Sequence, residues 1–236
     1  MIKLLILVFI QLVSLEATGL PIDYYEIKNS KEQKKSFFNI LAPMIKKEQK
    51  KIIEDREFVK QYFTSGLFGF NNDKLDILRL IKIKKYYKIK NLYSYDDYLS
   101  KIDTIPTSII LSQAALESGW GKSRFVRKAN NIFGQWTYSG KGLIPKNRDE
   151  NAKHRIKIFA TLQDAIKAYL RNINTHWAYK DLRKKRESLH KSKMVINGLD
   201  LYDQYINYSQ IREEYIKRLK KMILHNNLLI YDKVAN

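Results

Sequence analysis

A glutamate at the end of a short apolar segment is the residue of this sequence best placed for acid–base chemistry. The segment begins at Pro106, which suits the first turn of a helix, and Gly119 suits a left-handed cap just beyond its end. Glu117 therefore faces the negative end of the helix dipole among apolar neighbours. The dipole alone supplies about 0.3–1 kcal/mol, so burial has to supply the rest of the effect. We expect a carboxylic acid that stays protonated near neutral pH, as a general acid must.

The loop that follows this helix combines aromatic rings with amide groups. Two glycines flank an aromatic ring, and amide and aromatic residues follow within the same loop: Trp120, Asn130, Asn131, Phe133, Gln135 and Trp136. Flat aromatic faces stack on sugar rings, and amides bond to hydroxyl and N-acetyl groups. We therefore expect these six residues to bind a carbohydrate.

The order of these residues resembles a known family. The chain carries the runs Ala114-Ala115-Leu116-Glu117-Ser118-Gly119-Trp120-Gly121, Arg124-Phe125, Asn130-Asn131-Ile132-Phe133-Gly134-Gln135-Trp136, Asn174-Thr175-His176, Ala178-Tyr179 and Tyr208-Ser209. Together they are similar to the signature of peptidoglycan N-acetylglucosaminidases (glycoside hydrolase family 73) related to the flagellar FlgJ hydrolase domain, and within that group to the bacterial Bax-like proteins. The resemblance covers roughly residues 100–229, with a weaker likeness back to about residue 30.

This resemblance implies a fold, an activity and a set of site residues. The implied fold is mainly α (α+β), a lysozyme-like helical domain with a small β-hairpin lobe. The implied activity is hydrolysis of the β-1,4 bonds of peptidoglycan strands, with Glu117 as general acid and a second acid from the β-lobe. Asp149 and Glu150 are the candidates for that second acid, although both equally suit a solvated hairpin tip. Tyr179 matches a family position and is expected to bond the sugar or orient Glu117.

Three reaction courses remain open at this stage. If Asp149 or Glu150 activates water, the anomeric centre inverts and the two carboxyl groups lie about 6.5–9.5 Å apart. A separation of about 5–5.5 Å indicates a covalent intermediate instead. Participation by the N-acetyl group of the substrate needs only one protein acid. Muramidase or lytic transglycosylase action, and a non-enzymatic basic wall-binding protein, are the alternative functions.

The N-terminus and the composition bear on location and partners. Residues 1–19 carry a lysine, an apolar run and a small-residue cleavage site, which predicts a signal peptide, with an uncleaved anchor as the alternative. We therefore expect export to the periplasm or cell envelope. The net charge of +20 favours polyanionic partners, namely peptidoglycan with its associated anionic polymers rather than nucleic acid. There is no cysteine, and the histidines lack metal-ligand spacing, so we expect no cofactor or metal. We also expect a monomer.

The remaining pattern is helical except for one short region. We expect residues 20–100 to form a helical N-terminal region and residues 101–232 the catalytic domain, as one continuous unit. Ser30 and Gln33 are placed as a capping box for a helix that Pro43 should disturb. A further apolar helix is expected around Leu75, Leu78 and Ile81.

The C-terminal half contains the expected β element and more helices. Arg155 to Phe159 alternate in the strand period, which predicts a β-hairpin. Thr161 with Asp164 caps a following helix with an apolar face, and His176 and Trp177 are expected to pack against its neighbours.

Overall fold

The computed structural model describes residues 19–67, 74–145, 153–192, 195–209 and 211–233. The expected signal segment, apart from Gly19, lies outside these residues. The helices of the described structure are α1 Ile22–Glu26, α2 Ser30–Leu67, α3 Lys74–Tyr86, α4 Tyr95–Lys101, α5 Thr107–Ser118, α6 Arg124–Ala129, α7 Leu162–Thr175, α8 Lys180–Lys191, α9 Gly198–Leu201 and α10 Arg212–His225. Short 3-10 helices are η1 Trp177–Tyr179, η2 Tyr202–Tyr205 and η3 Leu228–Tyr231, and the strands are β1 Trp136–Thr137 and β2 Arg155–Ile156.

Helix α5 forms the centre of the structure because it is buried on nearly every side. All residues from Ser108 to Ala115 are buried, and α2, α9, α10 and η3 pack against the helix. Such a helix must satisfy its polar groups internally. Asp232 does so at its N-terminus, where the carboxylate accepts hydrogen bonds from the Ser108 amide at 2.8 Å and from its hydroxyl at 2.6 Å.

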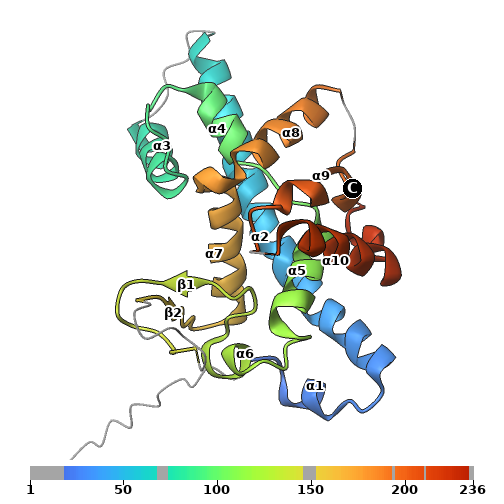
Figure 1. Cartoon of the computed structure of the whole chain (residues 1–236). Helices are drawn as coiled ribbons and strands as arrows, with labels where there is room; N and C mark the ends of the chain where they lie inside the picture. The colour runs from blue at the N-terminus through green and yellow to red at the C-terminus, as the bar shows by residue number, and fades with distance from the viewer. Residues whose placement is uncertain (1–18, 68–73, 146–152, 193–194, 210, 234–236) are drawn as a thin grey trace, which may run out of the picture.

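Helix α2 is a single element of 38 residues that packs on both α5 and α7. Figure 1 shows it crossing the molecule from the α1 end to the α3 end. Pro43, which was expected to disturb this helix, lies inside it, and the helix continues past the proline to Leu67. The expected capping box is also wrong: the Asn29 side chain accepts from the amides of Lys31 and Glu32, while the Gln33 side chain donates to Tyr24.

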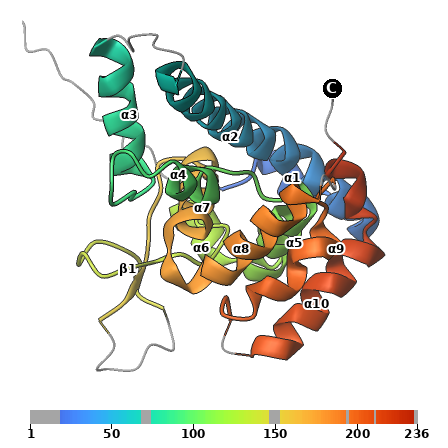
Figure 2. The same cartoon turned by 90° about the horizontal axis from the view of Figure 1, so that it is seen from above.

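The β-lobe is a two-stranded antiparallel sheet in which Trp136 pairs with Ile156 and Thr137 pairs with Arg155. Figure 2 places β1 and α10 on opposite sides of the molecule, with α5 and α8 between them. The second strand of the hairpin, β2, ends at Ile156 and is shorter than the Arg155 to Phe159 pattern predicts. The architecture is nevertheless the predicted mainly α fold with a small β lobe.

Helix α7 has the predicted cap and the predicted buried face. The Thr161 side chain accepts from the Asp164 amide at 3.1 Å, and the apolar residues of one face are buried: Leu162, Ile166, Tyr169, Leu170 and Ile173. Helix α3 forms as expected, but a different face of it is buried. Leu75, Leu78 and Ile81 are exposed, and its buried residues are Leu80 and Ile83. In the described part of the chain, no helix is both long and apolar enough to span a membrane.

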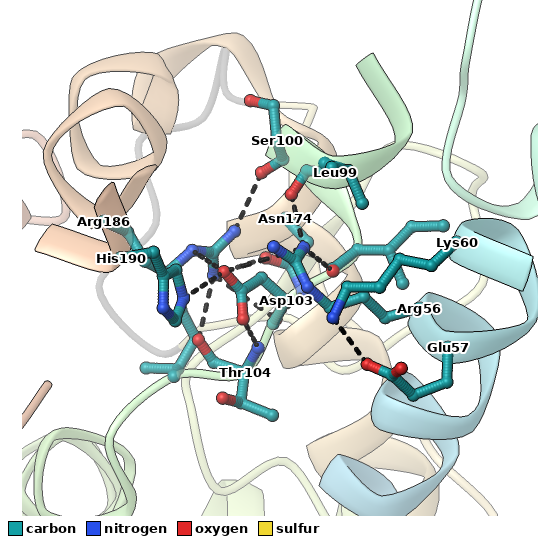
Figure 3. Close-up of polar contacts among 12 residues, drawn as sticks. Arg56, Glu57, Lys60, Leu99, Ser100, Asp103, Thr104, Asn174, Arg186 and His190 are labelled. Atoms are coloured by element: carbon teal, nitrogen blue, oxygen red, sulfur yellow. Dashed lines mark hydrogen bonds and ion pairs between the residues drawn. The ribbon is translucent and has the colours of Figure 1, made fainter. Parts of the chain in front are cut away.

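A buried ionic cluster ties α2 and α8 to the segment before α5 (Figure 3). Asp103 lies 3.3 Å from Arg186, 3.8 Å from Arg56 and 2.8 Å from His190. Arg186, which is 1% exposed, also donates to the backbone carbonyls of Ser100 and Thr104. Breaking such a pair on one side leaves a buried charge, so the cluster fixes how α2 and α8 sit against the segment before α5.

Candidate active site

Glu117 lies in the last turn of α5, where Gly119 forms the left-handed cap that the sequence predicts, with φ of 55°. Its side chain is half-buried. Burial raises the pKa of the Glu117 carboxyl, and a hydrogen bond from Tyr215 opposes that rise. The net direction is upward, so the expectation of a carboxyl with a raised pKa is confirmed.

A relay of hydrogen bonds on α5, α7 and α10 orients the carboxyl. Gln113 lies one turn before Glu117 on the same helix face, and its amide nitrogen donates to the Tyr215 hydroxyl at 2.9 Å. The Tyr169 hydroxyl in turn donates to the Gln113 side-chain oxygen. Because Tyr215 accepts from Gln113, its own hydroxyl proton is available for Glu117.

Two further tyrosines lie close enough to feel the charge on Glu117. Burial and then the Glu117 charge raise the pKa of Tyr179, which is 6% exposed. Tyr208 stacks on Tyr215 with ring centroids 5.5 Å apart, and its pKa is raised by burial, by Tyr215 and by Glu117. All three phenols therefore remain neutral hydrogen-bond donors. Tyr179 lies near Glu117, and its expected role in bonding the sugar or orienting Glu117 stays a prediction.

Gly134 faces Glu117 from the loop before β1. A Cβ atom at this position would lie 3.7 Å from Glu117 Oε2, and the backbone has φ of +64°, which L side chains rarely adopt. The loop thus passes the carboxyl at close range without a side chain to cover it. The Tyr208 hydroxyl holds the same loop by donating to the carbonyl of Phe133 at 3.1 Å.

The amides of Asn130 and Asn131 are used within the protein. Asn130 donates to the carbonyls of Phe159 and Ala160 and accepts from Gly19. Asn131 donates to the carbonyls of Gln135 and Lys157 and accepts from the Gln135 amide. Both side chains are at most 4% exposed, so they hold the loop against the segment that follows β2 rather than facing a ligand.

The other residues expected to bind sugar differ in their exposure. Phe133 is 3% exposed and stacks on Tyr169, and the Gln135 amide donates to the carbonyl of Ala165. Trp136 is 53% exposed and stacks on His154 with centroids 4.2 Å apart. Trp136 is thus the residue of this loop that presents a large aromatic surface to solvent.

Two tryptophans occupy positions that the sequence pattern does not predict. Trp120 packs edge to face on Phe37 at 5.6 Å and Phe38 at 5.4 Å, beneath α2, and its ring is partly covered. Trp177 was expected to pack against a helix but is 79% exposed. Trp120, which was expected to bind sugar, therefore packs in the interface with the N-terminal helices. The exposed Trp177 ring belongs to η1.

The second acid falls outside the described structure, since Asp149 and Glu150 belong to residues 146–152. The distance between either carboxyl and Glu117 therefore stays a prediction. Among the described residues, no group of three or more His, Cys, Asp or Glu side chains is arranged to hold a metal ion.

Sequence reasoning missed Tyr215 and Gln113 as parts of the site. Tyr215 stands at helical spacing with apolar residues such as Leu219, and a tyrosine in such a pattern gives no sign of which group its hydroxyl contacts. Gln113 was detectable in principle, because a polar residue four positions before Glu117 in an apolar helix shares its face.

Comparison with known proteins identifies the family of this chain. Residues 92–228 match the family model described as glucosaminidase, mannosyl-glycoprotein endo-beta-N-acetylglucosaminidase. The chain is 30% identical over 227 residues to Protein bax of Escherichia coli (strain K12), covering 92% of this chain and 78% of that relative. No solved structure matches it significantly. The family model matches more than half of the chain, and the relative is matched over most of both chains, so the chain belongs to the glucosaminidase family, as a Bax-like protein.

Proposed function

We propose that this protein is an exported peptidoglycan hydrolase that cleaves β-1,4 bonds after N-acetylglucosamine, with Glu117 as the general acid. The observation that carries the proposal is the environment of Glu117. Burial raises the pKa of its carboxyl, and Gly134 leaves one side of the carboxyl uncovered. A carboxylic acid with a raised pKa keeps its proton to higher pH and can donate it to a glycosidic oxygen.

The first chemical step follows from this arrangement. The Glu117 proton passes to the oxygen of the scissile bond while that bond breaks, and positive charge develops on the sugar ring. The hydroxyl of Tyr215 then stabilises the carboxylate that remains, since hydrogen bonds to a charged acceptor are the stronger ones. Tyr215 is a positioning residue in this scheme, and Gln113 positions Tyr215 in turn.

The attacking group completes the reaction. Asp149 or Glu150 activates water from the opposite face of the sugar, which inverts the anomeric centre. Trp136 offers the exposed ring on which a neighbouring sugar stacks. The net charge of +20 supports attraction to an anionic cell envelope, which suits a protein located in the periplasm or envelope.

Digestion of peptidoglycan tests both the bond and the acid. The purified protein, Glu117→Gln and the control Glu213→Gln are incubated with peptidoglycan, and the new ends are identified by mass spectrometry. Glu213 is an exposed carboxylate of α10, so its replacement should change nothing. We expect reducing N-acetylglucosamine ends that fall about 10²–10⁴-fold in Glu117→Gln only.

Other outcomes would redirect the proposal. Reducing muramic ends or anhydro products would retain a glycan-cleaving enzyme but move the cut to the other side of the sugar repeat. Cleavage that survives in Glu117→Gln would show that Glu117 is not the general acid. Absence of cleavage by every variant, with wall binding intact, would leave a basic wall-binding protein.

A further inference from the structure

A cavity of about 320 Å³ lies between α2, α3 and α7, and none of its lining residues belongs to the Glu117 site. Its size is at the lower end of the range for small-ligand pockets, about 300–1,000 Å³. Ile52 and Leu170 give it an apolar floor, and its other lining residues are charged or tyrosines: Glu48, Lys51, Glu54, Asp55, Tyr86, Tyr87, Lys167 and Arg171.

The charges in this cavity are separated by sign. Helix α2 supplies all three acids, and α7 supplies Lys167 and Arg171, four positions apart on one helix face. The one base on the α2 side, Lys51, pairs with Glu48 at 2.6 Å. Among the described residues, no ion pair joins the α2 acids to the α7 bases. Two walls of opposite charge thus face the same cavity without neutralising each other.

The basic wall is built for a carboxylate. Arg171 Nε donates to the carbonyl of Tyr86 at 2.8 Å, and its guanidinium lies 4.9 Å from the centroid of the Tyr86 ring. This contact fixes the guanidinium plane and uses only one of its five donors. Lys167 lies 5.9 Å from the same ring centroid and has no carboxylate partner in the described structure. A planar guanidinium with free terminal donors recognises carboxylates in bidentate fashion.

The acidic wall is built for an ammonium group. Asp55 accepts from the Tyr87 hydroxyl at 3.2 Å and lies 3.8 Å from Arg79. Burial, with the neighbouring Glu54 charge adding to it, raises the pKa of Asp55 against the effects of Tyr87 and Arg79. The charge of a second cation beside Asp55 and Glu54 would offset both the cost of desolvation and the repulsion between the two carboxylates.

We propose that this cavity binds a zwitterionic amino-acid group, with its carboxylate on Arg171 and Lys167 and its ammonium on Asp55 and Glu54. The cavity lining contains three acids and three bases, so it favours neither a simple anion nor a simple cation. Free amino acids and the peptide stems of peptidoglycan both carry this chemistry. The site is separate from the glycan-cleaving residues and does not depend on their activity.

Amide NMR titration of the full chain tests the proposal with defined probes. D-alanine is compared with alanine amide, which lacks the carboxylate, and with N-acetylalanine, which lacks the ammonium. We expect D-alanine to shift the amide signals of Tyr86, Tyr87 and Arg171. Each masked analogue should bind with an affinity lower by about tenfold or more. A soluble disaccharide-tetrapeptide from peptidoglycan is titrated in parallel. Tighter binding of that fragment assigns the cavity to substrate peptides, and tighter binding of D-alanine assigns it to a free amino acid.

Variants with matched charge changes complete the experiment. Lys167 is exposed, so Lys167→Gln should fold normally and weaken D-alanine binding about tenfold, as should Asp55→Asn. The control Lys217→Gln, on α10, and Glu117→Gln should bind as the unchanged protein does. Absence of shifts at the cavity with either zwitterionic probe, equal binding of the masked analogues, or unchanged binding in both cavity variants would overturn the proposal. Because the readout is binding, failure here is distinguishable from failure of the glycan-cleavage assay.

Discussion

Replacement of Tyr215 by phenylalanine removes a hydroxyl that donates to Glu117 while keeping the stacked ring on Tyr208. In the unchanged protein this hydrogen bond stabilises the Glu117 carboxylate and therefore lowers its pKa. Without it the pKa of Glu117 rises further, and the proton is held to higher pH. Since a general acid works only when protonated, the alkaline fall in kcat/KM should move to higher pH.

The expected size of this effect follows from the hydrogen bond that is lost. Hydrogen bonds to charged groups contribute about 1.5–3 kcal/mol, and the lower end applies because Glu117 is half-exposed. At a pH on the alkaline limb, the ratio of protonated to ionised Glu117 should therefore rise about tenfold. The buried Gln113 amide also loses its acceptor, so the free energy of unfolding should fall by about 1–3 kcal/mol.

The assay is the pH profile of kcat/KM for release of soluble fragments from peptidoglycan. Tyr98→Phe is the matched control, because the buried Tyr98 hydroxyl has no hydrogen-bond partner among the described residues. Tyr98→Phe should leave the profile in place and keep or increase stability. A uniform loss of activity in Tyr215→Phe without movement of the alkaline limb, or movement to lower pH, would refute the assigned role of Tyr215.

Two further predictions concern the buried ionic cluster and access to the acid. Burial raises the pKa of Asp103, but pairing with Arg186, followed by His190 and Arg56, lowers it more, and the pKa falls from 3.8 to about 2. Ionised Asp103 therefore stabilises the folded protein above about pH 3.8, and this stabilisation is lost as the pH falls towards 2. Asp103→Asn should therefore cost about 3–5 kcal/mol at neutral pH and little near pH 2, measured by urea unfolding at both pH values; equal losses would contradict this. Gly134→Val should cover the Glu117 carboxyl and abolish cleavage, whereas Gly140→Val, with similar backbone strain but nothing within 4 Å of the added carbon, should stay active in the same digestion assay. Loss of activity in both glycine variants would assign the effect to strain alone.

The fold was predictable where short stretches of sequence carry their own physical instructions. The left-handed cap at Gly119 and the Thr161 cap of α7 depend on backbone preferences and neighbouring side chains, so both are confirmed. The course of helix α2 was harder to predict from the sequence. Its cap is Asn29 rather than Ser30, and it continues through Pro43 because packing on α5 and α7 outweighs the local cost of proline.

The loop that was expected to bind a carbohydrate shows the limit of arguments from residue type. Asn130 and Asn131 have the chemistry to bond sugars, but their amides meet the carbonyls of residues near β2 instead. Whether an amide faces a ligand or the protein depends on which backbone groups lie nearby. That is a property of the assembled loop and strand, and residue type alone does not contain it.

By itself, the sequence determined that a carboxyl would end an apolar helix beside a glycine cap, because helix ends and caps are local. It also determined the family, through motifs spread over much of the chain. Only the tertiary structure decided that Tyr215 of α10 donates to Glu117, that Gln113 holds that tyrosine, and that two oppositely charged walls meet in the cavity between α2 and α7. These contacts join segments far apart in the chain, and they form only when helix packing brings the segments together.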